Sequence, residues 1–384
     1  MEHLTRLIRF SIVAVCALLT LFGVSSAFAE EKTLDIGMIF SLSGPAAPFG
    51  IPERDAAEIV AKDINDKGGV NGRAIRLHIF DDATNPTETA RGVTQLVQKN
   101  KVVAILGATT GSGTLAAAPV AMRYEVPMLA PNGTVDIVDK GNRFYPWVFR
   151  STTNDVINAQ KMLDAFVSDG AKKLAILHEE NAYGKAASDY IHEVAAKSGV
   201  TIVETVGAAS KAIDLTSQAT KIRNAGVDGV LMQVSSPALG GAFVRAAKQV
   251  GLNSPIIGPI GLGQKAFIEA AGDAGEGVRL VVVANWDAPA PEMEELGKLL
   301  VAADKPPRGF GELMATNGLL AVVAAAKSLH TEPTGKAIRD ALENVCGLQT
   351  YSTGKLCYSA DNHDGWGEDV PLLVEIRNGK FLPK

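Results

Sequence analysis

Basic clusters, cysteines and long apolar runs are all scarce in this 384-residue sequence. Its 37 Lys and Arg residues are outnumbered by 42 Asp and Glu residues and form no run that could follow the phosphates of a nucleic acid. We therefore expect no nucleic-acid partner. The length itself is sufficient for two domains.

The apolar run near the N-terminus, Phe10–Val24, is shorter than the ~20 residues that a membrane-spanning helix needs. Two arginines precede it, and Ala27–Ala29 follows it with the small-x-small pattern that signal peptidase reads. We therefore expect residues 1–29 to be a signal peptide that is cleaved before Glu30. The mature chain is then expected to be a soluble protein of the periplasm.

Export leaves only two cysteines in the mature chain, Cys346 and Cys357. In an oxidising compartment, a pair so close in sequence predicts one disulfide. Closing such a small loop stabilises a fold by ~3 kcal/mol in the chain-entropy model. The alternative, a two-thiolate metal site, lacks nearby His or Cys partners, and we expect no metal.

Catalytic motifs are missing or misplaced. The sequence has no Gly-Lys-Ser/Thr of a phosphate-binding P-loop, and Ser112 lacks the Gly-x-Ser-x-Gly spacing of a hydrolase. The glycines of Gly107–Gly113 fit a dinucleotide fingerprint but follow the third expected strand instead of the first. The segment 361–365 (DNHDG) lacks the spaced carboxylates of a calcium loop and reads as a hairpin turn. We expect neither an enzyme nor a cofactor.

Short apolar runs alternate with amphipathic stretches along most of the chain. Such alternation predicts parallel, doubly wound sheets, and strands buried on both faces are apolar throughout. A second series of these units begins after Arg150. The expected strands are Leu34–Phe40, Ile75–Phe80, Val102–Leu106, Pro127–Ala130, Leu174–His178, Ile202–Val206, Val230–Val234, Pro255–Ile257 and Leu280–Ala284.

Helix ends are also readable. Asn85-Pro86-Thr87-Glu88 has the residues of a capping box, which predicts that a helix begins there. Glycines end four helices of the second series, namely Gly170, Gly199, Gly226 and Gly251. The C-terminal third predicts three successive helices, Glu292–Ala303, Glu312–Ser328 and Thr334–Asn344, and then a hairpin-like tail.

The stretch Ala104–Pro119 (AILGATTGSGTLAAAP) runs from a strand through glycines and hydroxyls into an alanine-rich helix. Backbone N–H groups at such a helix start favour an anion. Other small, polar or aromatic residues follow the remaining strands, where open α/β sheets bind their ligands. The candidate ligand-binding residues are Phe49, Thr109, Thr110, Gly111, Ser112, Asn132, Thr134, Tyr183, Ser235, Ser236 and Ile260.

From about Leu34 onward the chain resembles the leucine/isoleucine/valine-binding protein family, the periplasmic receptors of branched-chain amino acid ABC importers. The resemblance rests on the segments SLSGPAAPFG, AKDINDKGGVNGRAIRLHIFDDATNP, APVAMRYEVPMLAP and AYG. It implies the type I periplasmic-binding-protein fold, with two doubly wound parallel-sheet lobes joined by a three-crossing hinge. The implied lobes are residues 30–150 with 286–345, and residues 151–285 with 346–384.

The resemblance also implies roles for several residues. The ligand carboxylate is expected at Thr110, Gly111 and Ser112 and at Thr134, although Gly111 stands where relatives carry a serine, so that Thr110 or Ser112 must supply that hydroxyl. Phe49 and Tyr183 are expected to line the ligand from the first and second lobes, respectively. The backbone carbonyl of Asn132 is expected to accept from a ligand ammonium.

One departure from the family leaves the ligand class open. Amino-acid receptors of the family place an acidic residue after the Gly-Pro strand end to pair the ligand ammonium, whereas this chain has Ile260. An unpaired buried ammonium is costly, unless Glu179 or Glu180 replaces the missing acid. The ligand is thus either a branched-chain or aromatic amino acid, or an aromatic or 2-keto acid that lacks the ammonium.

The expected function is that of a monomeric receptor that delivers a small carboxylate to an inner-membrane ABC permease. The alternative is an amide- or urea-responsive sensor subunit of the same fold, because a fold does not fix a function.

Overall fold

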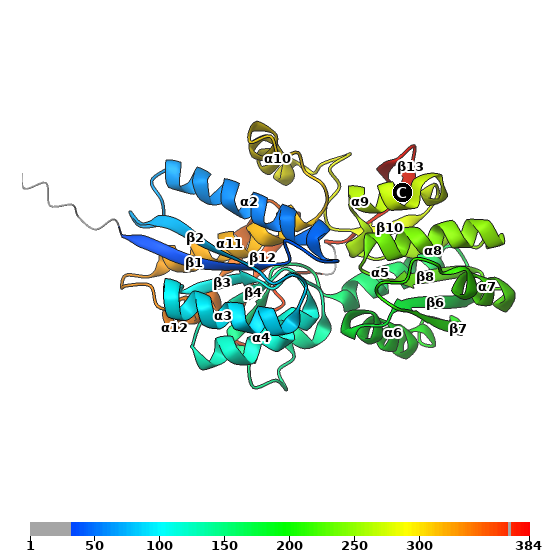
Figure 1. The fold of residues 1–384 in the computed structure, drawn as a ribbon, viewed down its shortest axis with the longest axis horizontal. Helices are drawn as coiled ribbons and strands as arrows, with labels where there is room; N and C mark the ends of the chain where they lie inside the picture. Colours follow the sequence, from blue (N-terminus) through cyan, green and yellow to red (C-terminus); the bar gives the residue numbers. More distant parts are fainter. Residues whose placement is uncertain (1–31, 368–369) are drawn as a thin grey trace, which may run out of the picture. The chain divides into compact units, whose positions relative to one another are not determined.

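Two larger β-sheets organise the part of the chain that the computed structural model describes, residues 32–367 and 370–384. The expected signal peptide, residues 1–29, lies outside the described residues. Leu34–Lys384 forms one compact unit, and within it each sheet carries its own helices as a separate lobe (Figure 1). In the described ranges, none of the helices has the length and apolar character that crossing a membrane requires.

The first sheet has the strand order β2-β1-β3-β4-β5, and its β1–β3, β3–β4 and β4–β5 pairs are parallel. All four residues of β3 are buried, as expected for a strand covered on both faces. Its strands are β1 (Thr33–Phe40), β2 (Ala74–Asp81), β3 (Ala104–Gly107), β4 (Met128–Ala130) and β5 (Val148–Arg150).

Helices cover both faces of the first sheet. The side chain of Asn85 accepts from the N–H groups of Thr87 (2.9 Å) and Glu88 (3.5 Å), which confirms the predicted helix start. The helices of this lobe are α2 (Ala47–Asp66), α3 (Pro86–Asn100), α4 (Gly111–Arg123), α10 (Glu294–Ala302), α11 (Gly311–Ser328) and α12 (Gly335–Leu342).

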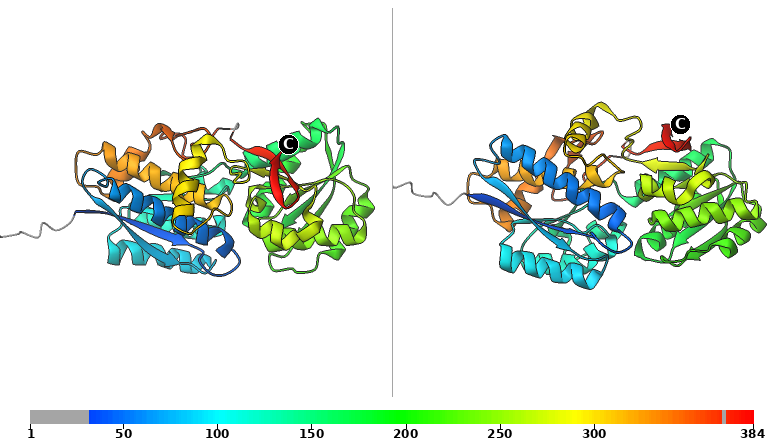
Figure 2. Two further views of the ribbon diagram at one scale, coloured as in Figure 1. Left: turned by 90° about the horizontal axis from the view of Figure 1, so that it is seen from above. Right: turned by 45° about the horizontal axis from the view of Figure 1, so that its top comes forward.

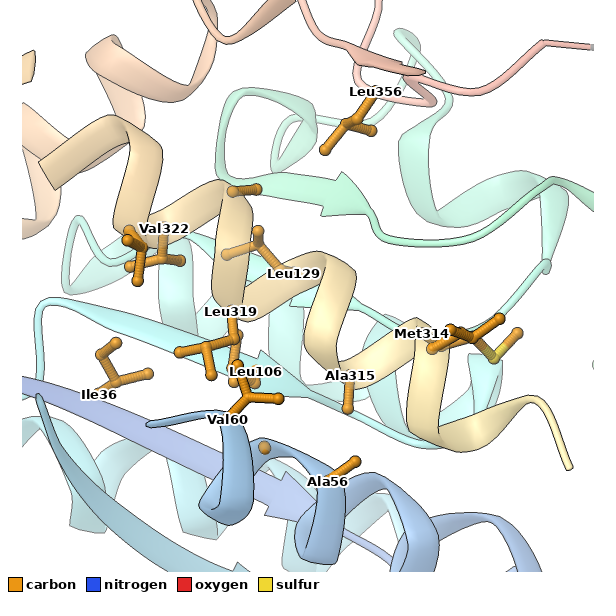
Figure 3. Packing of buried hydrophobic residues seen from close by; sticks show 14 of the residues in the cluster. Ile36, Ala56, Val60, Leu106, Leu129, Met314, Ala315, Leu319, Val322 and Leu356 are labelled. Carbon is orange, nitrogen blue, oxygen red and sulfur yellow. The ribbon is translucent and has the colours of Figure 1, made fainter. Parts of the chain in front are cut away.

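The core of the first lobe is the contact between α2 and α11. Figure 3 shows Ala56 and Val60 of α2 turned toward α11, with Ala315 and Leu319 of α11 facing them. All four side chains are almost fully buried, and full burial of a Leu or Val side chain contributes about 1.5–3 kcal/mol. This packing draws a helix from the C-terminal third of the chain against an N-terminal one.

The second sheet has the strand order β14-β13-β10-β9-β8-β6-β7, parallel from β10 to β7. The edge strands β13 and β14 are antiparallel, so a C-terminal hairpin extends the parallel part of this sheet. Its strands are β6 (Lys173–Glu179), β7 (Thr201–Ala208), β8 (Gly229–Gln233), β9 (Ile256–Gly258), β10 (Arg279–Val282), β13 (Leu372–Arg377) and β14 (Lys380–Pro383).

The helices of the second lobe end largely as predicted. Gly226 (φ 63°) and Gly251 (φ 75°) end their helices in the left-handed conformation that favours glycine. These helices are α5 (Asp155–Ser168), α6 (Ala182–Ala195), α7 (Thr216–Ala225), α8 (Pro237–Val250) and α9 (Lys265–Ala271).

Short 3-10 helices also occur along the described chain. They are η1 (Val135–Val138), η2 (Tyr145–Trp147), η3 (Ile260–Leu262), η4 (Gly272–Gly275) and η5 (Pro291–Met293).

The chain passes between the sheets three times, after β5, after β10 and before β13, which confirms the predicted type I topology. The expected lobe boundary at residue 346 differs from the structure. Leu356, Tyr358 and Trp366 pack in the core of the first lobe, because the hairpin of β11 (Cys346–Gln349) and β12 (Lys355–Cys357) follows α12 directly. Only the hairpin of β13 and β14, red in Figure 2, joins the second lobe.

A disulfide joins Cys346 of β11 to Cys357 of β12, as predicted. We expect replacement of both cysteines by serine to lower the free energy of unfolding by ~3 kcal/mol, because the unfolded chain regains the entropy of the open loop. Denaturant unfolding followed by circular dichroism measures this change, with alkylation of the unreduced protein as a control for free thiols. Equal unfolding midpoints, or two reactive thiols, would contradict it.

Candidate functional site

A pocket of about 600 Å³ receives residues from both lobes. Its walls include the loops that follow β1, β2, β3 and β4 of the first sheet and β6, β7, β8 and β9 of the second, the carboxyl ends at which parallel sheets bind ligands. The sequence-predicted site residues all line it, namely Phe49, Thr109, Thr110, Gly111, Ser112, Asn132, Thr134, Tyr183, Ser235, Ser236 and Ile260.

The N-terminus of α4 opens into this pocket. The hydroxyl of Thr110 accepts from the N–H of Gly113 (3.1 Å) and so caps the helix. A side chain on Gly111 would overlap Oγ1 of Thr134, a residue that is buried and follows β4. The hydroxyl of Thr134 therefore occupies the space that a serine at position 111 would fill, beside the first N–H groups of the helix. This end of the pocket is suited to an anion.

Asn132 braces the same loop. Its side-chain amide donates to the carbonyl of Ala108 and to Oγ1 of Thr114, both at 3.0 Å. Its backbone carbonyl accepts from Nη1 of Arg150 (2.8 Å). This carbonyl already accepts from Arg150. A ligand ammonium, the expected partner, would therefore have to share the carbonyl oxygen with that guanidinium.

Arg150 is a structural residue that the sequence did not single out. It is completely buried at the end of β5, and its guanidinium also donates to the carbonyl of Thr134 (2.9 Å) and pairs with Asp364. The strand that it ends, β5, was not among the expected strands, so no sequence signal marked its burial, although a buried charge requires partners.

The second lobe contributes a carboxylate. Glu179, the last residue of β6, is buried, and its Oε2 accepts from the backbone N–H (3.0 Å) and the hydroxyl (2.8 Å) of Ser235. Glu180 is exposed and does not contribute to the pocket among its described residues. Of the two glutamates considered from the sequence, Glu179 is therefore the one that lines the pocket.

Two further acids in the pocket were missed. Asp155 begins α5, and its backbone N–H donates to the carbonyl of Gly133 (2.8 Å); burial raises the pKa of its carboxyl to about 7, against the opposing effect of Arg150. Glu53 lies one helical turn after Phe49 on α2, and burial raises the pKa of its carboxyl to about 8. Candidate residues were sought directly after the expected strands. Neither Asp155 nor Glu53 stands there, so the sequence analysis did not select them.

Apolar side chains form another part of the wall. The rings of Phe49 and Phe310 are 5.5 Å apart and tilted by 50°. Met314 and Ile260 line the pocket beside them, and Ile260 also belongs to the hydrophobic core that includes α11. The hydroxyl of Tyr183 lies 3.5 Å from Oε1 of Gln233.

Lys211, in the loop after β7, is the one cation among the described residues that line the pocket. In the same part of the chain, no group of three or more His, Cys, Asp or Glu side chains is arranged to hold a metal ion. The pocket thus combines a helix N-terminus, an aromatic wall and buried carboxyl groups. Such a set is suited to holding a small, partly apolar anion, with or without an ammonium group.

Two binding proteins align with most of this chain in sequence. It is 27% identical over 341 residues to the leucine-, isoleucine-, valine-, threonine- and alanine-binding protein of Pseudomonas aeruginosa, covering 88% of each chain. It is 24% identical over 287 residues to the Leu/Ile/Val-binding protein of Escherichia coli, covering 74% of this chain and 76% of the relative.

Solved structures agree in fold. An extracellular ligand-binding receptor from Rhodopseudomonas palustris superposes with a TM-score of 0.84 at 22% identity, covering 92% of this chain and all of that one. A branched-chain amino acid ABC transporter protein from Thermus thermophilus with bound valine gives 0.81 at 19% identity, covering 92% and 95%. The model of the family described as periplasmic binding protein matches residues 33–372, and the chain with this two-lobed pocket belongs to that family.

Proposed function

We propose that this chain is the periplasmic receptor of an ABC importer and that it binds a small, largely apolar carboxylate by closure of its two lobes. The observation that carries the proposal is the N-terminus of α4 with the Thr134 hydroxyl beside it, inside a pocket with an aromatic wall. Export through the N-terminal signal, delivery to an inner-membrane permease and a monomeric state belong to the same proposal.

The favoured ligand is a branched-chain or aromatic amino acid. Its carboxylate would lie at the start of α4, its side chain against Phe49 and Phe310, and its ammonium near Glu179. In this proposal the buried Glu179 pairs with the ligand ammonium, which the apolar side chain of Ile260 cannot do. Relatives named for binding leucine, isoleucine and valine support this choice.

The second candidate ligand is an aromatic or 2-keto acid without an ammonium group. Ile260 favours it, because an apolar side chain stands where a positively charged group would need a partner. The sensor alternative would instead bind an uncharged amide, which gains little from the α4 N-terminus.

Closure follows from differential affinity. A ligand held first by α4 and Phe49 gains contacts with Tyr183 and Glu179 only when the lobes approach, so it favours the closed state. Micromolar binding corresponds to about −8 kcal/mol, which a few charge-assisted hydrogen bonds and a buried side chain supply after the cost of ordering.

Thr134 tests the anion site. Thr134→Val keeps the volume but removes the hydroxyl, and we expect it to weaken carboxylate binding by ~1.5–3 kcal/mol, the range for a hydrogen bond to a charged group. Thr134→Ser keeps the hydroxyl and should bind nearly as the unmodified protein does. Isothermal calorimetry measures both; equal affinities of the valine and serine variants, with both folded, would remove Thr134 from the site.

Glu179 tests the ammonium partner. We expect Glu179→Gln to weaken leucine binding at least tenfold, because a neutral amide pairs poorly with an ammonium, and to change binding of 4-methyl-2-oxopentanoate little. Glu180→Gln, the exposed neighbour, is the matched control and should alter neither. Unchanged leucine binding in Glu179→Gln would show that another group meets the ammonium.

Ile260 tests which ligand class the pocket prefers. We expect Ile260→Glu to strengthen leucine relative to 4-methyl-2-oxopentanoate, because the new carboxylate pairs an ammonium but lies unpaired beside a ketone. Ile260→Gln controls for the loss of apolar volume. Paired calorimetric titrations measure the ratio of affinities, and a ratio that stays constant across the three proteins would place position 260 away from the amino group.

A further inference from the structure

Glu53 is the most enclosed acid of the pocket. It lies on α2 four residues after Phe49, so that both side chains share one face of the helix. Only 1% of the residue is exposed, yet it contributes to the pocket wall. A carboxyl oxygen in this position that has no protein partner is available to a ligand.

One oxygen of Glu53 is already used. The hydroxyl of Thr109 accepts from the backbone N–H of Ser41 (3.0 Å) and donates to Oε2 of Glu53 (2.5 Å). The Thr109 contact is the one hydrogen bond of the Glu53 carboxyl in the described part of the chain, so that Oε1 is left for a ligand in the pocket. Thr109 was predicted from sequence to contact the ligand. Its hydroxyl instead donates its hydrogen bond to Glu53 and orients that side chain.

The charged groups that face Glu53 are both acidic. Asp82, after β2, is buried and accepts from the hydroxyl of Ser41 (2.6 Å) and the N–H of Thr84 (2.8 Å). Glu312, in the first turn of α11, accepts from the backbone N–H of Arg308 (2.6 Å). The neighbouring cations are engaged elsewhere, since Arg54 and Lys305 both pair with Asp55.

This environment favours the neutral acid. Burial is the main cause that raises the pKa of Glu53 to about 8; the Thr109 hydrogen bond lowers it, and Asp82 and Glu312 raise it. Because Oε2 accepts from Thr109, the proton of the neutral acid lies on Oε1. That O–H is a donor without a protein partner beside the anion end of the pocket.

We propose that Glu53 is a ligand-binding residue that donates a hydrogen bond from Oε1 to the ligand carboxylate, so that an anion and a proton are held together. The inference rests on the proposed function, because it takes the ligand to be a carboxylate. An ionised Glu53 would instead repel that carboxylate. Affinity should therefore fall about tenfold per pH unit once Glu53 loses its proton.

The first measurement needs no ligand. In protein labelled with carboxyl-¹³C glutamate, the signal absent from Glu53→Gln identifies Glu53, and its titration gives the protonation state. We expect a neutral acid at neutral pH. A Glu53 that is ionised there overturns the proposal, whichever ligand the protein binds.

The second measurement couples the proton to binding. Calorimetry in buffers of different ionisation enthalpy, at about pH 9, should show uptake approaching one proton per bound 4-methyl-2-oxopentanoate, a probe with no group that titrates near that pH. Glu53→Gln should show no uptake and an affinity that is constant with pH. Glu58→Gln, an exposed glutamate of the same helix, is the matched control and should behave as the unmodified protein.

The outcomes separate the two proposals. Binding without proton uptake in the unmodified protein, or uptake that persists in Glu53→Gln, overturns the role of Glu53 and leaves the receptor function intact. If 4-methyl-2-oxopentanoate does not bind, benzoate serves as the second probe, with the same expectations. Failure of both of these and of leucine and phenylalanine overturns the proposed function, and with it the ligand contact of Glu53. The measurements on the unmodified protein hold even if Glu53→Gln does not fold.

Discussion

The burial of one guanidinium governs the geometry around the pocket. Arg150 has no exposed surface, and a buried charge is tolerated only when acceptors surround it. Carbonyls of the loop after β4 and the carboxylate of Asp364 meet that requirement, so the loop that carries Thr134 is held to the end of β5. Asp364 also accepts from Asn154, the residue that caps α5. A single cation thus fixes the anion site of the first lobe, the start of the second lobe and the returning C-terminal segment at one point.

The small polar residues around the pocket divide by how their hydroxyls and amides are used. Thr110 and Ser236 cap helices α4 and α8, and Asn181 caps α6, so these residues shape the loops from which they come. Ser235 holds Glu179 and Thr109 holds Glu53. We therefore expect selectivity to depend on the groups that these small residues position, which are helix N–H groups and carboxyl groups.

Much of the fold was predictable because its signals are local. Each expected strand is present within two residues of its predicted ends. Helix caps and glycines flank the apolar runs and so limit where each strand can begin and end. The short β5 was missed, and the β11–β12 hairpin was given to the wrong lobe, because its place depends on the burial of Leu356 and Tyr358 in the core of the first lobe. The expectation that ligands bind at the carboxyl ends of parallel strands identified loops that line the pocket. It could not find Glu53 or Asp155, which enter the pocket from helices, nor decide between Glu179 and Glu180, which differ only in the face of the chain that they occupy.

The charge of the pocket then follows from where each acid is held. Three carboxyl groups and one lysine line it, which by formal charge would repel an anion. Burial raises the pKa of Glu53 on the first-lobe wall to about 8, whereas Glu179 on the second-lobe wall accepts two hydrogen bonds from Ser235. In the proposed complex the first lobe therefore offers donors, from α4, Thr134 and the neutral acid proposed for Glu53, and the second lobe offers an acceptor. In the proposed closed state, a ligand that is negative at one end and positive at the other would meet both walls at once. An acid without an ammonium would meet the first wall alone and would leave Glu179 bonded only to Ser235.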